Sequence, residues 1–309
     1  MMSRILTFAL FFVALTGCES NKRAGDITLA NQATVSTPSS HQSPEMTGTT
    51  NLLTSSGAVN TSGATAELVS PQQSEKKSAS DDSTEVSNSK IPARTLTIVR
   101  TKPDCKGADC PVIKVKRLFF TGRDRFNSFL DRTMASMVQM ESNQAKTFDS
   151  FGEFAEYFWR TSKPRDEVII EASVKRGDED LVVVQLESYI YSGGAHGMST
   201  TQYINWLPKT DRLLSLETML LPNKMQAFQT VLKKQYDNWI KQNKDAISNP
   251  ASYKKKWPFV ENDNAALLKE GVAITYDPYA IAPYSFGRPT LIVPYKDLKG
   301  ILRPELLAQ

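Results

Sequence analysis

The sequence is poor in the residue types that build most catalytic centres. Its 309 residues include only two histidines and three cysteines, and there is no His-x-x-His pair or carboxylate pair at metal-ligand spacing beside either histidine. It also lacks a Gly-x-Ser-x-Gly elbow and a phosphate-binding glycine loop. We therefore expect no catalytic residues, no metal and no cofactor. The alternative is a cell-wall-modifying hydrolase or deacetylase that uses His196.

A hydrophobic run long enough to cross a membrane is also missing. Residues 5–15 are uncharged and largely apolar, but this run is shorter than the roughly 20 residues that a membrane-spanning helix needs. The run ends at Leu15, which together with Thr16, Gly17 and Cys18 matches the order of a bacterial lipobox. We expect residues 1–17 to be a lipoprotein signal peptide and Cys18 to carry the lipid that anchors the protein in the membrane. An ordinary secretory signal with a chance cysteine is the alternative.

The segment from residue 18 to residue 94 contains no aromatic residue and is rich in Ser, Thr, Asn, Gln, Gly and Ala. Such a composition buries too little apolar surface to offset the loss of chain entropy on folding. We expect these residues to form a disordered, lipidated linker. Glu19, instead of aspartate, follows Cys18 and favours the outer membrane, with the chain facing the periplasm.

Residues 95–309 contain all the Trp and Tyr residues and every Phe outside the signal peptide, so we expect one domain there, with up to two lobes. The net charge of the chain is only +4. The one basic run, Lys254 to Lys256, is too short to indicate nucleic-acid binding and is typical of a solvated helix end. We expect no nucleic-acid partner.

Two cysteines remain in this domain, Cys105 and Cys110. An exported protein meets an oxidising environment, and the intervening loop contains a glycine. We expect a disulfide between them. A metal site is the alternative, but two thiols without further ligands give it little support.

The apolar pattern predicts helices mixed with strands that are mainly linked by hairpins. This is the pattern of an α+β fold with an antiparallel sheet packed with several helices. Ser150 to Glu153 has the form of a helix-starting capping box. The expected strands are 113–120, 167–174, 181–191, 200–207, 272–276 and 290–293, and the expected helices are 124–138, 150–159, 225–240 and 296–302.

Two segments have unusual compositions. The first, residues 191–197, contains Tyr191, Gly193, Gly194, His196 and Gly197, with the only histidine of the domain. It is either a binding loop or a tight crossover between strands whose histidine ring bonds the backbone.

The second segment, residues 276–287, contains Tyr276, Tyr279 and Tyr284 together with two prolines. Rigid, tyrosine-rich loops bind sugars or protein surfaces well, but they also serve as core plugs, and the sequence leaves both readings open.

These two segments resemble the extracytoplasmic domain of RsiV-type anti-sigma factors and the non-catalytic end of PdaC-type peptidoglycan deacetylases. The resemblance extends to residues 205–216 and 292–298 and covers roughly residues 113–302. It implies an α+β domain that works at the cell envelope and, in RsiV-type members, binds lysozyme. The chain differs in having a lipobox, no sigma-binding segment and no deacetylase module, so direct signalling to a sigma factor is not expected.

Together these features favour an envelope lipoprotein that acts as a non-enzymatic binding module. Its expected partners are the membrane, through the lipid on Cys18, and either peptidoglycan or a lysozyme-like protein. We expect both unusual segments to contribute to one surface. A scaffold for envelope assembly is a further alternative.

Overall fold

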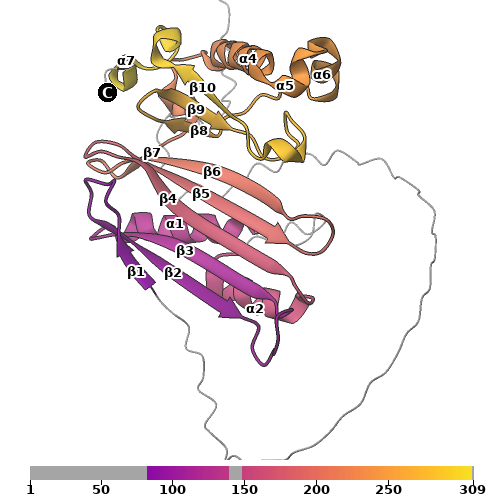
Figure 1. The fold of residues 1–309 in the computed structure, drawn as a ribbon. Helices are drawn as coiled ribbons and strands as arrows, with labels where there is room; N and C mark the ends of the chain where they lie inside the picture. The colour runs from indigo at the N-terminus through magenta and orange to yellow at the C-terminus, as the bar shows by residue number, and fades with distance from the viewer. Residues whose placement is uncertain (1–81, 139–147, 308–309) are drawn as a thin grey trace, which may run out of the picture.

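The computed structural model describes residues 82–138 and 148–307. Within them the chain forms a seven-stranded sheet and a three-stranded sheet, each packed with helices (Figure 1). This confirms the expected α+β class. The proposed signal peptide, Cys18 and nearly all of the expected linker lie outside the described residues.

The strands of the large sheet follow one another in chain order. They are β1 (Asp82–Glu85), β2 (Ala93–Thr101), β3 (Val112–Phe120), β4 (Glu167–Gly177), β5 (Val182–Tyr191), β6 (Met198–Leu207) and β7 (Arg212–Leu214). Neighbouring strands are antiparallel except β3 and β4, which are parallel. The exception arises because α1 (Asp124–Ser136) and α2 (Phe151–Thr161) connect β3 to β4 and return the chain to the end where β3 began.

The folded part begins earlier than expected. The linker was expected to continue to residue 94, but β1 and the start of β2 lie within it. An edge strand is held largely by backbone hydrogen bonds to one neighbour, so a polar sequence does not prevent it from forming. Val86 and Ile91, on either side of the turn, also pack against the core.

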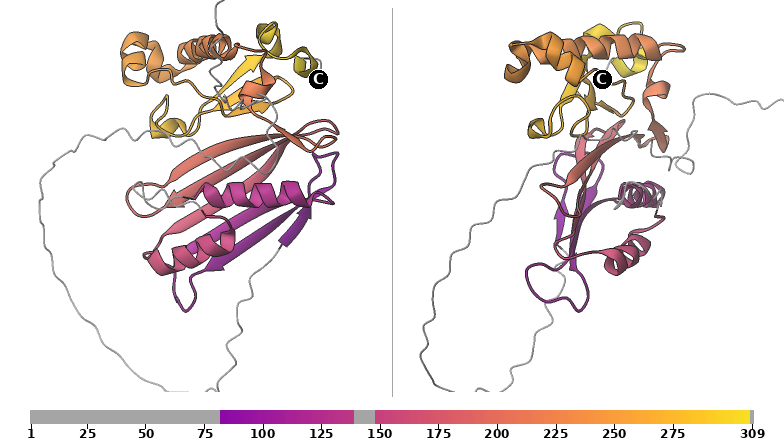
Figure 2. Two further views of the ribbon diagram at one scale, coloured as in Figure 1. Left: turned by 180° about the vertical axis from the view of Figure 1, so that it is seen from behind. Right: turned by 90° about the vertical axis from the view of Figure 1, so that its right-hand side faces the viewer.

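One face of the large sheet is covered by α1 and α2 (Figure 2). The apolar stripes predicted for these helices supply the core there, where the rings of Phe126 and Trp206 stack with centroids 4.0 Å apart. The predicted start of α2 is confirmed, because the Ser150 hydroxyl accepts a hydrogen bond from the Glu153 backbone N–H. Glu153 reaches back to the N–H of Asp149 and not to that of Ser150.

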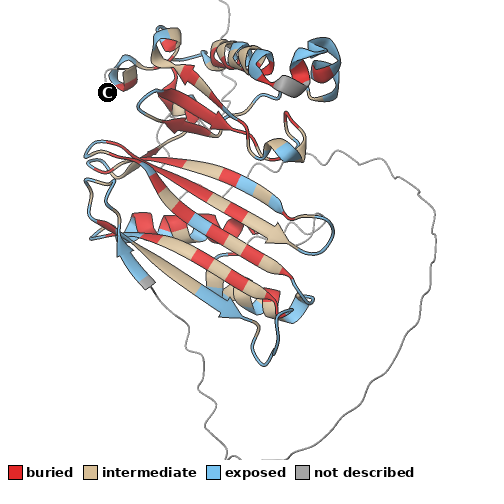
Figure 3. Cartoon of the chain, viewed as in Figure 1, coloured by how far each residue is buried: buried red, intermediate tan, exposed pale blue. Residues whose placement is uncertain are grey.

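The rest of the chain forms a second unit beside β5, β6 and β7 (Figure 1). Its elements are α3 (Leu216–Met219), α4 (Met225–Gln242), α5 (Lys244–Ile247), α6 (Pro250–Lys256), β8 (Ala265–Leu267), β9 (Gly271–Thr275), the 3-10 turn η1 (Tyr284–Phe286), β10 (Thr290–Pro294), the 3-10 turn η2 (Tyr295–Leu298) and α7 (Pro304–Leu307). All residues of β8 and β9 are buried (Figure 3). The chain therefore has two cores, as the expectation of up to two lobes allowed.

The expected strands and the three longer helices are all present, and Lys254 to Lys256 end α6, as expected. The prediction of a helix at residues 296–302 is wrong. The structure has the short turn η2 there, and Gly300 takes a positive φ of 74°, which interrupts any helix.

The second unit is hydrogen-bonded to the outer edge of β6, which β7 pairs only from Asn205 onward. The Asn264 side chain donates to the carbonyl of Thr201 at 2.6 Å and accepts from the N–H of Tyr203 at 2.7 Å. The Asn205 side chain donates to the carbonyl of Ala265 at 2.7 Å and accepts from the N–H of Leu267 at 2.9 Å. These side chains take the place of an additional paired strand and satisfy backbone groups that would otherwise be buried without partners.

We expect Asn205→Ala to destabilise the protein by about 2–4 kcal/mol, because it leaves the Ala265 carbonyl and the Leu267 N–H unsatisfied in a buried place. Denaturant unfolding of the full chain would measure this loss. The control is Asn238→Ala on α4, which removes an amide that bonds no other described residue. An equal loss in both variants would contradict the assigned role of Asn205.

Candidate ligand-binding site

The glycine-rich segment forms the loop between β5 and β6. Gly193 and Gly194 have φ values of 100° and 86°, which other residues rarely adopt. Gly197 is required for a different reason, since an added Cβ would lie 2.5 Å from both the Ile190 carbonyl oxygen and Cζ of Tyr189. The hydroxyl of Tyr191 donates to the Gly194 carbonyl at 3.1 Å and holds the loop against the end of β5.

The tyrosine-rich segment connects β9 to β10. Tyr279 is 44% exposed and has a φ of 69°, an unfavourable conformation for a residue other than glycine. Tyr284 begins η1 and is partly exposed. Tyr276 does not fit the expected binding role, because its ring is only 1% exposed and its hydroxyl donates to the Val260 carbonyl. Burial also raises the pKa of this hydroxyl. Tyr276 is therefore a core residue, as the interpretation of the segment as a core plug predicts. Tyr279 faces solvent, as the interpretation as a binding loop requires.

The two segments contact each other, and a ligand-binding role for the surface that they form stays a prediction. The rings of His196 and Tyr284 stack with centroids 3.6 Å apart. The Tyr284 hydroxyl donates to the Gly197 carbonyl at 3.1 Å. Nδ1 of His196 lies 3.1 Å from the same carbonyl, and Nε2 lies 3.0 Å from the Tyr279 hydroxyl.

These contacts fix the orientation of the histidine ring. A carbonyl oxygen can only accept, so Nδ1 carries a proton, while Nε2 is hydrogen-bonded to the Tyr279 hydroxyl. The bond to the backbone is the one expected for a tight crossover. His196 thus fixes the position of the exposed Tyr279.

Sequence reasoning missed two rings beside this surface. Trp257, just after α6, lies roughly parallel to Tyr279 with centroids 6.3 Å apart. Tyr189 on β5 accepts a hydrogen bond from the N–H of Gly197. Neither carries a motif, although the alternation along β5 places Tyr189 on the same face as Tyr191. We call His196, Tyr279, Tyr284 and Trp257 the ring cluster.

Both ends of the tyrosine-rich segment are attached to Thr201 of β6, and this anchorage was also not foreseen. At one end, Asp277 accepts from the Thr201 N–H at 2.9 Å. At the other end, Arg288 donates to the Thr201 hydroxyl at 2.9 Å and forms an ion pair with Glu187 at 2.6 Å. The segment is therefore held in place without a regular element of its own beyond η1.

Burial raises the pKa of Asp277 to about 6, against the lowering effect of hydrogen bonds from Thr201 and Thr200 and of the nearby charge of Arg288. The unfolded chain has an ordinary carboxyl pKa, near 3.8. Protonated Asp277 therefore stabilises the folded protein at low pH. This contribution is lost as the pH rises from the unfolded pKa of 3.8 through the folded pKa of about 6.

The site offers little support for hydrolytic chemistry. Both ring nitrogens of His196 are engaged by a carbonyl and a phenol, whereas a catalytic histidine is normally oriented by a carboxylate or paired with a nucleophile. Among residues 82–138 and 148–307, no three His, Cys, Asp or Glu residues are grouped so that they could hold a metal ion.

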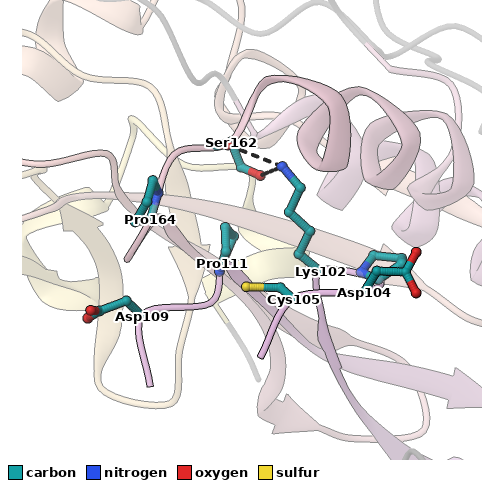
Figure 4. A pocket seen from close by; sticks show the side chains of 8 residues that line it. Lys102, Asp104, Cys105, Asp109, Pro111, Ser162 and Pro164 are labelled. Carbon is teal, nitrogen blue, oxygen red and sulfur yellow. Dashed lines mark hydrogen bonds between the residues drawn. The ribbon is translucent and has the colours of Figure 1, made fainter. Parts of the chain in front are cut away.

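The expected disulfide is confirmed, since Cys105 and Cys110 are bonded with their Cα atoms 5.7 Å apart. Beside it lies a depression of about 290 Å³ (Figure 4). The Lys102 ammonium spans it and donates to the carbonyl and hydroxyl of Ser162, both at 3.4 Å. Asp104 and Asp109 lie at opposite ends and do not point toward one another. The depression therefore has no convergent group with which to bind a ligand.

We expect Gly197→Ala to destabilise the protein by about 1–3 kcal/mol, because its Cβ would force apart the Ile190 backbone and the Tyr189 ring. The control is Gly152→Ala in α2, where the nearest atom to the new Cβ lies 3.8 Å away. That change should stabilise the helix by roughly 0.5–1 kcal/mol. Thermal or denaturant unfolding measures both, and a neutral Gly197→Ala would contradict the packing described.

We also expect the stability of the wild-type protein relative to Asp277→Asn to fall by about 2–3 kcal/mol between about pH 4 and pH 7, because only the wild type has to ionise a buried carboxyl. Urea unfolding of both proteins across this range tests the prediction. Curves that stay parallel would show that the carboxyl titrates normally.

The chain is similar to proteins of one uncharacterised family. Residues 217–296 match the family model described as "Protein of unknown function (DUF3298)". A crystal structure of a DUF3298 family protein from Pseudomonas aeruginosa PAO1 is 29% identical, with a TM-score of 0.65, over 71% of this chain and 97% of that protein. A DUF3298 member from Bacteroides fragilis NCTC 9343 is 16% identical, with a TM-score of 0.54, over 74% of this chain and 96% of that protein, and it shows the fold alone. No curated protein matches the chain. The second unit, including the segment that carries Tyr279 and Tyr284, is thus the part that matches the DUF3298 model.

Proposed function

We propose that this protein is a non-enzymatic binding module of the bacterial cell envelope that uses the ring cluster to bind cell-wall glycan. The observation that carries the proposal is the pairing of exposed Tyr279 with His196, which joins residues far apart in the sequence into one aromatic surface. Aromatic faces bind the apolar faces of sugar rings, and a tyrosine hydroxyl adds a polar contact.

The backbone conformation of Tyr279 supports this assignment. A non-glycine residue with a positive φ costs free energy, and such residues concentrate at ligand-binding sites, where the surrounding structure holds them in place. Here His196 and the anchored ends of the segment hold it. A ring fixed before the ligand arrives loses little entropy on binding.

A lysozyme-like protein is the second candidate partner. It is favoured by the match of residues 217–296 to the DUF3298 model, which is compatible with the RsiV-type resemblance. The net charge of +4 does not favour a strongly basic partner, so binding would depend on local shape and on acidic side chains at the contact.

Two further alternatives are weaker. A hydrolase or deacetylase would need His196 to move protons, and both of its nitrogens have other partners. A scaffold role in envelope assembly would use the same exposed rings with a protein partner.

The place of action is part of the proposal. The lipobox at Cys18 supports a lipid anchor that tethers the protein to the outer membrane, with the domain facing the periplasm. No helix of the part that the structure describes is both long and apolar enough to span a membrane.

Calorimetric titration of the full chain with muropeptides, and separately with c-type lysozyme, tests the function. We expect muropeptide binding that Tyr279→Ala weakens roughly tenfold or more, as for an aromatic anchor. The control is Phe119→Ala, which removes an aromatic ring of 36% exposure from β3. Binding of lysozyme alone would favour the second candidate, and muropeptide binding that Tyr279→Ala leaves intact would exclude the ring cluster as the site.

A further inference from the structure

The large sheet has a second hollow, away from the ring cluster. The face of the sheet opposite α1 and α2 is uncovered along β2, β3 and β4 (Figures 1 and 2). At the end where β1 turns into β2, a hollow of about 370 Å³ lies over this face. This volume is within the range of small-molecule sites in proteins. Its lining consists of Thr84, Glu85, Val86, Ser87, Asn88, Thr95, Thr97, Lys116, Leu118, Ala172, Ser173 and Val174.

The chemistry of the lining is that of a polyol site. Five of its side chains are threonine or serine, whose hydroxyls both donate and accept hydrogen bonds. Among the residues that the structure describes, none bonds the hydroxyls of Thr97 and Ser173. Leu118 and the neighbouring apolar residues supply an apolar wall. One lysine and one glutamate leave the lining without net charge, which favours a neutral ligand.

The hollow lies on the same face of the sheet as Tyr189, whose hydroxyl bonds the N–H of Gly197 next to His196 of the ring cluster. Lys116 of β3 lies opposite Glu171 of β4. Two residues before Glu171, Ile169 lies opposite Tyr189 of β5. Lys116 and Tyr189 are therefore about two strand spacings and one pleat repeat apart, roughly 12 Å. Glu171 between them is exposed, so the intervening surface is open to solvent.

We infer that this hollow is a second subsite, and that one neutral glycan strand crosses the uncovered face from the ring cluster to Thr97 and Ser173. The inference rests on the proposed function and adds the length of the ligand to it. A sugar polymer suits both ends, because its ring faces stack on aromatic side chains and its hydroxyl and acetamido groups pair with threonine and serine.

The test uses the full chain with chitobiose and chitohexaose as short and long probes, measured by calorimetry. Wild type should bind chitohexaose more tightly than chitobiose, because only the long probe reaches both subsites. The double variant Thr97→Val with Ser173→Ala removes two hydroxyls with little change of shape, and it should weaken chitohexaose binding roughly tenfold. It should leave chitobiose binding unchanged.

Thr101→Val is the matched control, because Thr101 lies on the same face of β2 outside the hollow. Unchanged chitohexaose binding in the double variant, with binding lost in Tyr279→Ala, would overturn the second subsite and leave the proposed function standing. Weakened lysozyme binding with unchanged chitohexaose binding would make this face a protein contact, which also overturns the inference. Absence of chitohexaose binding in the wild type would overturn the inference, whereas the proposed function is decided separately by muropeptide binding.

Discussion

The outer edge of β6 is the constraint on which the rest of the structure depends. A strand edge presents backbone N–H and C=O groups that need partners, and β7 supplies them only from Asn205 onward. Upstream of that point, Asn264 and Asp277 of the second unit bond the backbone of Thr201 and Tyr203. These hydrogen bonds join the two cores and fix how the second unit sits on the large sheet.

The same bonds place the candidate site. Asp277 and Arg288 attach both ends of the tyrosine-rich segment to Thr201, so the segment lies next to the β5–β6 loop. The glycines of that loop then allow His196 to stack on Tyr284 and to form a hydrogen bond with Tyr279. An irregular segment is thus rigid because its two ends are anchored on a sheet edge. A surface of this kind is prepared for binding without needing to reorganise.

Much of this fold could be predicted from the sequence, because apolar periodicity reports directly which residues face a core. The stripe from Phe126 to Met134 and the alternation in β4 and β5 both predicted the correct elements. β1 was missed because a short polar edge strand is held by backbone bonds that side-chain patterns do not record. The roles of Asn205 and Asn264 were missed for a related reason, since an asparagine that completes a sheet edge looks like any surface asparagine in the sequence.

The site was predictable only in part. Glycine and proline spacing identified both loops, and their contact was expected, but composition does not distinguish buried Tyr276 from exposed Tyr279.

Hydrogen–deuterium exchange of the full chain with and without muropeptides is the most direct test of where a ligand binds. We predict protection at residues 192–201 and 276–288, where the ring cluster and its anchors lie. Protection confined to other segments, with these two unchanged, would contradict the account.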